Sequence, residues 1–393
     1  MRVLLLTHSF WPDASPPQRR WGAFTRVFAA AGHEVDVITP QVCDVDHVKC
    51  ASGQAPPDGV RVHRYRSIHK PHTMAGKLVK HVLDAISSVP RALRTPKPDV
   101  VIATVPAIPT LVVGFLVSRL RRVPFVLDLR DAWPDLLKDS QVLRGLWLEP
   151  VVSRVLKYMI DRSDLVVTVT QGFARRLASS GTRKTATVSN GVEVEKYETD
   201  LRPVPRGDKL RVLYLGNLGR SQGLDLVIRA AGMMKHDVEL RIVGQGTEKT
   251  RMEWLAAQLG VQVEFRDPVY GPRVLEHYVW ADTCLVTLRA DWNSFEHTIP
   301  SKLYELLLLN RHITGLVKGE AAQMIAGSGA GHIVEQSQEA LSRHFRALHS
   351  ERSLLEIGQA GSEWVRQYAS LSALGERYLQ EISKLTEPRG STK

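Results

Sequence analysis

The chain is poor in cysteine and shows no spacing typical of metal ligands. Three cysteines, Cys43, Cys50 and Cys284, are few for 393 residues and odd in number, which argues against a framework of disulfide bonds. The 14 histidines are scattered without the spacing of a metal site. The Asp-x-Asp triplet that begins at Asp44 is predicted to lie in a solvated loop. We therefore expect no metal and no cofactor.

Long apolar runs are also scarce. The longest, Val100–Val117, approaches the ~20 residues of a membrane-spanning helix, but Pro106 and Pro109 interrupt it. The apolar run that begins at Val3 is too short for the core of a secretion signal. We expect no transmembrane helix and a cytoplasmic protein.

Acidic residues are nearly absent between Val60 and Pro98, where Asp84 is the single acid among nine lysines and arginines. This stretch carries most of the surplus behind the net charge of +11. Apolar residues recur in it at helical spacing, which predicts a basic amphipathic helix with a kink at Pro90. They are Met74, Leu78, Val82, Ile86, Val89 and Leu93. Such a helix either lies on an anionic membrane or packs its apolar stripe on its own domain. No aromatic stacking platform or binding motif accompanies the basic residues, so nucleic acid is not an expected partner.

The apolar runs that are present are short and rich in β-branched residues, and helical stretches separate them. The first series begins at Val3, Val35, Val60, Val100, Phe125, Leu165 and Thr185, and the second at Leu210, Val238, Val261, Thr283, Ile313 and Gly331. This alternation predicts two parallel, doubly wound α/β sheets. We predict Rossmann-like domains over residues 1–199 and 200–370, with a final helix over 371–393 that packs on either one. Ligands of such sheets bind at the carboxyl ends of the strands, so the two domains are expected to face each other across a ligand-binding cleft.

Glycine follows two successive strands of the second predicted domain. The first strand runs into Gly216 and Gly219, and the second into Gly244 and Gly246. Glycine lets backbone amides approach an anion, and two such turns in succession indicate a shared ligand site. The first strand of the chain is followed instead by THSFWPD, which lacks the G-x-G-x-x-G pattern of a dinucleotide oxidoreductase.

The segment FEHTIPSKLYEL places Glu305 in an apolar helical run just after a Pro-Ser-Lys turn. The helix N-terminus and the Lys302 ammonium, which we expect to point outward, would attract a diphosphate. An ionised carboxylate among leucines needs a polar partner, and ribose hydroxyls are suitable ones. The alternative is a surface helix on which Lys302 and Glu305 face water.

Several motifs follow one another in a recognisable order. They are HSFWPD, AAGHEVDVIT, PAIPTL, FVLDLRDAWPD, SNGV, YLGNLG, IVGQG, IPSKLYE and GEAAQMIAGSGAG. This order resembles that of the retaining GT-B glycosyltransferases of family 4, in particular bacterial members that transfer N-acetylhexosamine-type sugars to cell-surface polysaccharides. The resemblance covers essentially the whole chain. It implies a metal-independent transfer of a hexose-type sugar, with retained configuration, from a nucleotide-sugar to a lipid-linked or cell-surface polysaccharide precursor at the inner face of the membrane. The nucleotide that the resemblance favours is uridine.

The resemblance also implies roles for single residues. Glu305 would bind the ribose, and the other donor contacts would be Gly216, Asn217, Arg220, Gly244, Val269, Ser301, Lys302 and Leu303. Family members carry a glutamate near the transferred sugar eight residues before Glu305, where this chain has His297 beside Glu296. Many members also carry arginine and lysine at the positions of Asn217 and Gln222. Either Glu296 or His297 would therefore contact the sugar, and Arg220 would supply the charge.

The remaining catalytic candidate is Asp131, which follows a strand of the first domain. It either orients the acceptor and takes part in catalysis or caps a helix, and His8 would face the same cleft. Lys302 and Arg220 would neutralise the departing diphosphate together with the helix N-terminus. Two alternatives share the predicted fold. They are a sugar-nucleotide epimerase, which needs acid and base groups but no acceptor surface, and a noncatalytic binding protein for nucleotide sugars.

Overall fold

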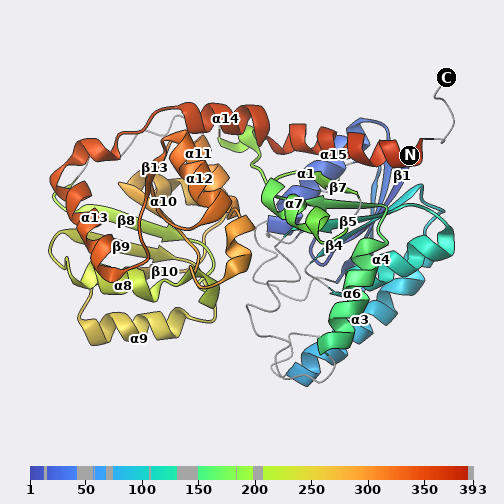
Figure 1. The fold of residues 1–393 in the computed structure, drawn as a ribbon, viewed down its shortest axis with the longest axis horizontal. Helices are drawn as coiled ribbons and strands as arrows, with labels where there is room; N and C mark the ends of the chain where they lie inside the picture. The colour runs from blue at the N-terminus through green and yellow to red at the C-terminus, as the bar shows by residue number, and fades with distance from the viewer. Residues whose placement is uncertain are drawn as a thin grey trace. The chain divides into compact units, whose positions relative to one another are not determined.

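The protein forms two compact units (Figure 1). The computed structural model describes residues 1–12, 16–41, 56, 58–67, 74–105, 108–130, 149–182, 184–197 and 207–387. The first unit comprises Met1–Gly191 and Leu371–Lys393, and the second comprises Val192–Ser370. The ends of the second unit meet, because the Val192 amide donates a hydrogen bond of 3.0 Å to the carbonyl of Ala369.

The first unit is built on a parallel sheet with the strand order β3-β2-β1-β4-β5-β6-β7. Its strands are β1 (Arg2–Leu6), β2 (Glu34–Pro40), β3 (Val60–Tyr65), β4 (Val100–Val105), β5 (Phe125–Leu129), β6 (Leu165–Thr168) and β7 (Thr185–Thr187). Its helices are α1 (Pro16–Ala30), α3 (Met74–Arg94), α4 (Ile108–Arg121), α6 (Glu149–Asp161), α7 (Gln171–Ser179) and α15 (Leu371–Thr386). Each apolar run of the first predicted series forms one of these strands.

Helices cover both faces of this sheet, which explains why its central strands β1, β4 and β5 are buried at nearly every position and largely apolar. On β1, Leu4 and Leu6 belong to one core cluster, together with residues of α4 and α6. Val3 and Leu5 point to the opposite face and belong to a second cluster with residues of α1 and α15. The predicted doubly wound α/β architecture is therefore confirmed for this unit.

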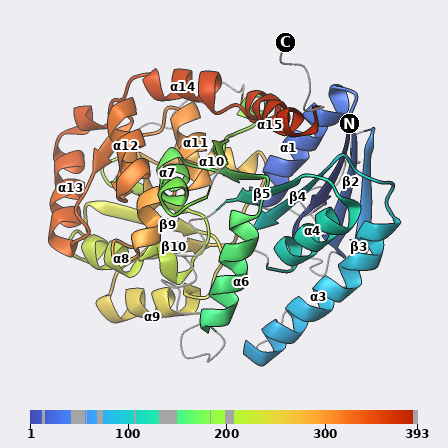
Figure 2. The same cartoon turned by 45° about the vertical axis from the view of Figure 1, so that its right-hand side comes forward.

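The C-terminal helix α15 packs on the first unit, beside α1 (Figures 1 and 2). Tyr378 of α15 is fully buried, and its ring lies 5.3 Å from that of Trp21 and 5.6 Å from that of Phe24. Aromatic pairs at these separations add to the free energy gained from burial. The last helix thus returns to the unit in which the chain begins.

A buried ion pair joins α1 to the sheet beneath it. The guanidinium of Arg20 lies 3.4 Å from the carboxylate of Asp128 on β5, and both side chains are almost completely buried. Arg20 also donates to the carbonyls of Ser189 at 2.5 Å and Val188 at 2.9 Å, directly after β7. One cation therefore holds α1, β5 and the end of β7 together.

Helix α3 turns a different face to the sheet from the one that its apolar spacing predicts. Asp84, Ser88 and Ala92 are buried, whereas Val82, Ile86 and Leu93 of the predicted stripe are exposed by 51%, 62% and 38%. Val89 is the member of the stripe that packs against the core, and it is half-buried. The helix continues through Pro90. Small side chains at four-residue spacing allow α3 to approach its neighbours closely, and the pairing of Asp84 with Lys80 at 2.6 Å lets the acid be buried.

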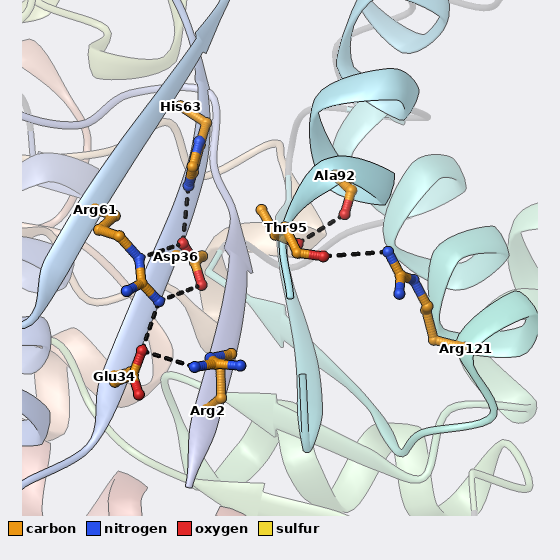
Figure 3. Close-up of polar contacts among 8 residues, drawn as sticks. All are labelled: Arg2, Glu34, Asp36, Arg61, His63, Ala92, Thr95 and Arg121. Carbon is orange, nitrogen blue, oxygen red and sulfur yellow. Dashed lines mark hydrogen bonds and ion pairs between the residues drawn. The ribbon is translucent and has the colours of Figure 1, made fainter. Parts of the chain in front are cut away.

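Part of the basic surplus is used in contacts within the first unit (Figure 3). Arg61 on β3 makes two hydrogen bonds, of 3.0 and 3.1 Å, to Asp36 on β2, and His63 lies 2.8 Å from the same carboxylate. Glu34 accepts hydrogen bonds from both Arg61 and Arg2. These pairs fix the outer strands β2 and β3 to β1.

The second unit contains a parallel sheet with the order β10-β9-β8-β11-β12-β13. Its strands are β8 (Leu210–Leu215), β9 (Val238–Val243), β10 (Val263–Arg266), β11 (Thr283–Thr287), β12 (Ile313–Leu316) and β13 (Gly331–Ile333). Its helices are α8 (Asp225–Gly232), α9 (Lys249–Leu259), α10 (Arg273–Trp280), α11 (Ser301–Leu308), α12 (Gly319–Ser328), α13 (Gln338–Ser350) and α14 (Ala360–Tyr368), with short 3-10 turns η1 (Val194–Tyr197), η2 (Arg220–Gln222), η3 (Asn293–His297) and η4 (Arg352–Leu355). The second predicted α/β series is confirmed as well.

Candidate functional site

The candidate site of the second unit lies where the order of its strands reverses. Strand β8 has β9 on one side and β11 on the other, and open parallel sheets bind ligands at the carboxyl ends of the strands beside such a point. The loops that follow β8 and β11 are joined here. The Arg289 amide donates to the carbonyl of Ser221 at 2.9 Å, and the Thr287 hydroxyl donates to that of Gln222 at 2.7 Å.

The two predicted glycine turns touch each other through their backbones. Gly216 after β8 and Gly244 after β9 have φ angles of 151° and 150°, which side chains rarely adopt. A Cβ atom on Gly244 would lie 1.9 Å from the carbonyl oxygen of Gly216. Both positions therefore favour glycine, and the two strand ends are in direct backbone contact.

Gln222 closes the turn after β8. Its side-chain oxygen accepts a hydrogen bond of 3.1 Å from the Gly219 amide, so this residue shapes the loop. Asn217 and Arg220 are exposed, and the carbonyl of Asn217 accepts a hydrogen bond of 2.7 Å from the Tyr214 hydroxyl. The loop thus presents one cation, Arg220, to solvent.

Glu305 is buried on α11, and only 8% of its surface is exposed. One carboxylate oxygen accepts a hydrogen bond of 3.0 Å from the hydroxyl of Tyr278 on α10. Burial, followed by the Glu305 carboxylate, raises the pKa of Tyr278 well above its ordinary value, so the phenol remains a donor. The alternative of a surface helix with Glu305 in water is therefore wrong.

The expectation that Lys302 points its ammonium outward is also wrong. The Lys302 Nζ atom is buried and lies 3.6 Å from the centre of the Tyr214 ring. It is also 3.0 Å from the position that a Cβ atom on Gly216 would occupy. Burial lowers the pKa of Lys302 to about 7, although the nearby Glu305 acts to raise it. The Lys302 amine therefore lies beneath the glycine turn, whereas Arg220 is the cation that the loop presents to solvent.

Glu296 and His297 lie in η3, which packs against the beginning of α12. Glu296 is exposed, and His297 Nδ1 is 3.6 Å from a carboxylate oxygen of Glu320. Gly319 has a φ of 58°, and a Cβ there would lie 2.0 Å from the carbonyl oxygen of Glu296. Both candidates for the sugar contact therefore stay in a loop that α12 holds in place. Val269 is half-buried in the loop after β10, and Ser301 and Leu303 form the first turn of α11.

In the first unit, His8 lies just beyond the carboxyl end of β1. Burial, and secondarily the Arg130 guanidinium, lower the pKa of His8 to about 4, so the imidazole is neutral at pH 7. Asp131 lies outside the described residues, and its predicted role stays a prediction. The same holds for the triplet at Asp44 and for Cys43 and Cys50.

Sequence reasoning missed the two tyrosines that contact the candidate site. Tyr214 lies beneath Lys302, and Tyr278 binds Glu305. Both occur in apolar runs, where a tyrosine is indistinguishable from an ordinary core residue. The position of Tyr214 two residues before Gly216 is the one signal that pointed to it.

Family models match both units of the chain. A model described as a glycosyl transferase 4-like domain matches residues 17–191, and one described as glycosyl transferases group 1 matches residues 198–363. The chain belongs to the GT-B glycosyltransferases of family 4.

Known proteins resemble this glycosyltransferase in sequence or in fold. It is 23% identical over 350 residues to WcaI of Escherichia coli strain K12, a glycosyl transferase named for colanic acid biosynthesis, and the match covers 82% of this chain and 86% of WcaI. Sucrose-phosphate synthase of Thermosynechococcus elongatus superposes with a TM-score of 0.77 at 15% identity, over 98% of both chains. HepE of Anabaena, solved with UDP and glucose, gives a TM-score of 0.71 at 15% identity, over 98% of this chain and 100% of HepE.

Within the described ranges, no group of three or more histidine, cysteine, aspartate or glutamate side chains is arranged to hold a metal ion. In the same part of the chain, no helix combines the length and apolar character needed to cross a bilayer.

Proposed function

We propose that the protein is a retaining hexosyltransferase that moves an N-acetylhexosamine-type sugar from a uridine diphosphate carrier to a hydroxyl of a lipid-linked or cell-surface polysaccharide precursor. The observation that carries the donor assignment is the convergence of Gly216, Lys302 and Glu305 at the point where the second sheet reverses its strand order. The polysaccharide acceptor is supported by the name of WcaI, and uridine by the UDP bound in HepE.

The donor would lie along the first turn of α11. Glu305 is three residues after Lys302, so the two side chains leave the helix on similar sides. The carboxylate, already oriented by Tyr278, accepts hydrogen bonds from the ribose. The diphosphate lies at the glycine turns, where backbone amides, the α11 N-terminus and Lys302 stabilise the charge that grows as the sugar leaves. These groups supply the stabilisation without a metal.

The sugar would be transferred with its anomeric configuration kept. The acceptor oxygen forms its bond to the anomeric carbon on the face from which the diphosphate departs, and the acceptor proton passes to the departing diphosphate oxygen. Asp131 and His8 of the first unit are proposed to orient the acceptor, and Glu296 or His297 is proposed to contact the transferred sugar.

We further propose that the first unit docks on an anionic membrane at the inner face of the cell, where a lipid-linked acceptor would be found. Helices α3 and α4 pack side by side (Figure 2), and both expose large apolar side chains. They are Val79, Val82, Leu83, Ile86 and Leu93 on α3, with Leu116 and Leu120 on α4. Basic residues end both helices: Arg91 and Arg94 on α3, and Arg119 and Arg121 on α4. Exposed apolar side chains beside basic ones match the chemistry of an anionic bilayer surface.

Flotation with lipid vesicles tests this docking surface. The wild-type protein is expected to float with vesicles that contain phosphatidylglycerol, and to do so less at high salt. The double variant Ile86→Glu/Leu120→Glu should lose most of this binding. Trp254→Glu, which changes a side chain on α9 that is 61% exposed, should keep it. Equal flotation of the double variant and the wild type would contradict the proposed surface.

The proposed reaction is tested by incubating the purified protein with UDP-N-acetylglucosamine and a membrane lipid extract from a bacterium that makes surface polysaccharide. We expect donor-dependent release of UDP together with a lipid whose mass rises by one N-acetylhexosamine. Conversion of the donor into a different UDP-sugar without release of UDP would identify an epimerase instead. Binding without any change in the donor or the lipid would favour a noncatalytic binding protein.

A further inference from the structure

The Lys302 side chain holds its amine in surroundings that disfavour a positive charge. Its Nζ atom is buried, and among the residues that the structure describes it has no hydrogen-bond partner. A lysine ammonium carries three donors, and burying them without acceptors costs free energy unless the group gives up its charge. The Tyr214 ring, 3.6 Å below, attracts a cation but accepts no conventional hydrogen bond.

Few charges act on this ammonium from the elements around it. Glu305 of the same helix favours the charged form, but its carboxylate is already bonded to Tyr278 of α10. Cys284 of β11 is also near, and burial raises the pKa of its thiol to about 12, so the thiol is neutral at pH 7. Burial likewise raises the pKa of Tyr214 on β8, which is neutral as well. Glu305 is therefore the anion that acts on Lys302 within the described residues.

The open side of Lys302 is the glycine turn at which the proposed donor diphosphate would lie. Nζ lies 3.0 Å from the point where a Cβ on Gly216 would stand, so at this position no side chain separates the amine from the backbone of the loop. A diphosphate at this turn would supply both the acceptors and the negative charge that Lys302 lacks.

We propose that Lys302 is largely uncharged in the donor-free enzyme at mildly alkaline pH and takes up one proton from solvent when a nucleotide-sugar diphosphate binds. The inference rests on the proposed donor site and adds to it a linkage between donor affinity and pH. One N–H bond forms on Nζ, and the proton comes from water or buffer, because the diphosphate of a UDP-sugar carries no proton to give near neutral pH. The donor thereby creates the cation that holds it.

The expected size of the effect follows from the pKa of Lys302, which burial places near 7. Such a group is about nine-tenths charged at pH 6 and about one-tenth charged at pH 8. If the bound form stays charged, donor binding takes up roughly 0.1 proton at pH 6 and roughly 0.9 proton at pH 8. The affinity for the donor should then fall about tenfold between these pH values.

Isothermal titration of the whole protein with UDP-N-acetylglucosamine measures this uptake directly. The titration is repeated at pH 6 and pH 8 in buffers of different ionisation enthalpy, and the dependence of the observed heat on that enthalpy gives the number of protons taken up. We expect the wild type to show the rise in uptake from pH 6 to pH 8. Lys302→Met should bind more weakly, with no uptake at pH 8 and no loss of affinity between the two pH values.

The control is Lys235→Met, which removes an exposed lysine in the turn after α8 that donates to the Leu259 carbonyl. It should keep the wild-type uptake. Donor binding by the wild type without proton uptake at pH 8 would overturn the inference and leave the proposed function standing, whereas failure to bind any donor would overturn both. Uptake that survives in Lys302→Met, or in Lys302→Gln if the first variant does not fold, would assign the proton to another group and contradict the proposal.

Discussion

Replacing Glu305 by alanine is expected to weaken the binding of UDP-N-acetylglucosamine by about 10- to 150-fold, the range that corresponds to the loss of a hydrogen bond to a charged group. The carboxylate is buried on α11, and Tyr278 holds one of its oxygens, so its orientation is fixed before the ribose arrives. A preorganised carboxylate loses little conformational entropy on binding, which is why its removal should be costly.

The variant needs controls, because the Tyr278 hydroxyl loses its acceptor when Glu305 is shortened. Thermal unfolding without ligand shows how much of the effect is structural, and Glu305→Gln keeps the size of the side chain while removing its charge. Glu363→Ala, which changes an exposed glutamate on α14, should bind the donor as the wild type does. Equal affinities of the wild type and Glu305→Ala would show that the donor does not use this helix.

Replacing Arg20 by methionine is expected to destabilise the first unit by about 3–5 kcal/mol, the usual result of removing one partner of a buried ion pair. Methionine is similar in length but leaves Asp128 charged and buried. It also leaves the carbonyls of Val188 and Ser189 without the hydrogen bonds that Arg20 gives them. Urea unfolding followed by the fluorescence of the tryptophans measures the change in the free energy of unfolding.

Two further variants test whether the loss of stability comes from the buried ion pair. Arg19→Met changes the exposed neighbour on α1 and should alter stability by less than about 0.5 kcal/mol. The double variant Arg20→Met/Asp128→Leu removes both charges and should recover part of the loss, because an apolar pair no longer leaves an ion unpaired. A loss below about 1 kcal/mol in Arg20→Met, or no recovery in the double variant, would contradict this account of the pair.

The alternation of short apolar runs was sufficient to predict both sheets. Each predicted run corresponds to one strand, because a parallel strand covered on both faces must be apolar at nearly every position. The glycine turns at Gly216 and Gly244 were also predicted as strand ends. The structure adds the reason why glycine is favoured at both, which is the direct backbone contact between them.

The orientation of side chains could not be predicted in the same way. Helix α3 carries an apolar stripe through Ile86 and a small-residue stripe through Ser88, and the second one packs on the unit. A helical wheel predicts that the most apolar face of a helix is buried. In α3 the buried face is the one with small side chains, which let the helix pack closely against its neighbours. The apolar side chains of the other stripe, Ile86 among them, are then left exposed.

The orientation of the Lys302 side chain in the candidate site could not be predicted from the sequence either. A lysine in the first turn of a helix is expected to reach into solvent, yet this one folds beneath Gly216 onto Tyr214. The cause is a contact between residues almost ninety positions apart in the sequence, which no local pattern records. Gln222 is a similar case, because its role in closing the turn depends on the backbone of Gly219.

The most direct test of the central claim, that the second unit binds a nucleotide-sugar at α11 and the glycine turns, is a calorimetric titration of the wild-type protein with UDP-N-acetylglucosamine, UDP-glucose, GDP-mannose and free N-acetylglucosamine. We expect saturable binding of at least one UDP-sugar at one site per chain, strongly weakened in Glu305→Ala, with no comparable binding of the free sugar. No binding of any nucleotide-sugar by correctly folded protein, or binding that is equal in Glu305→Ala, would contradict it.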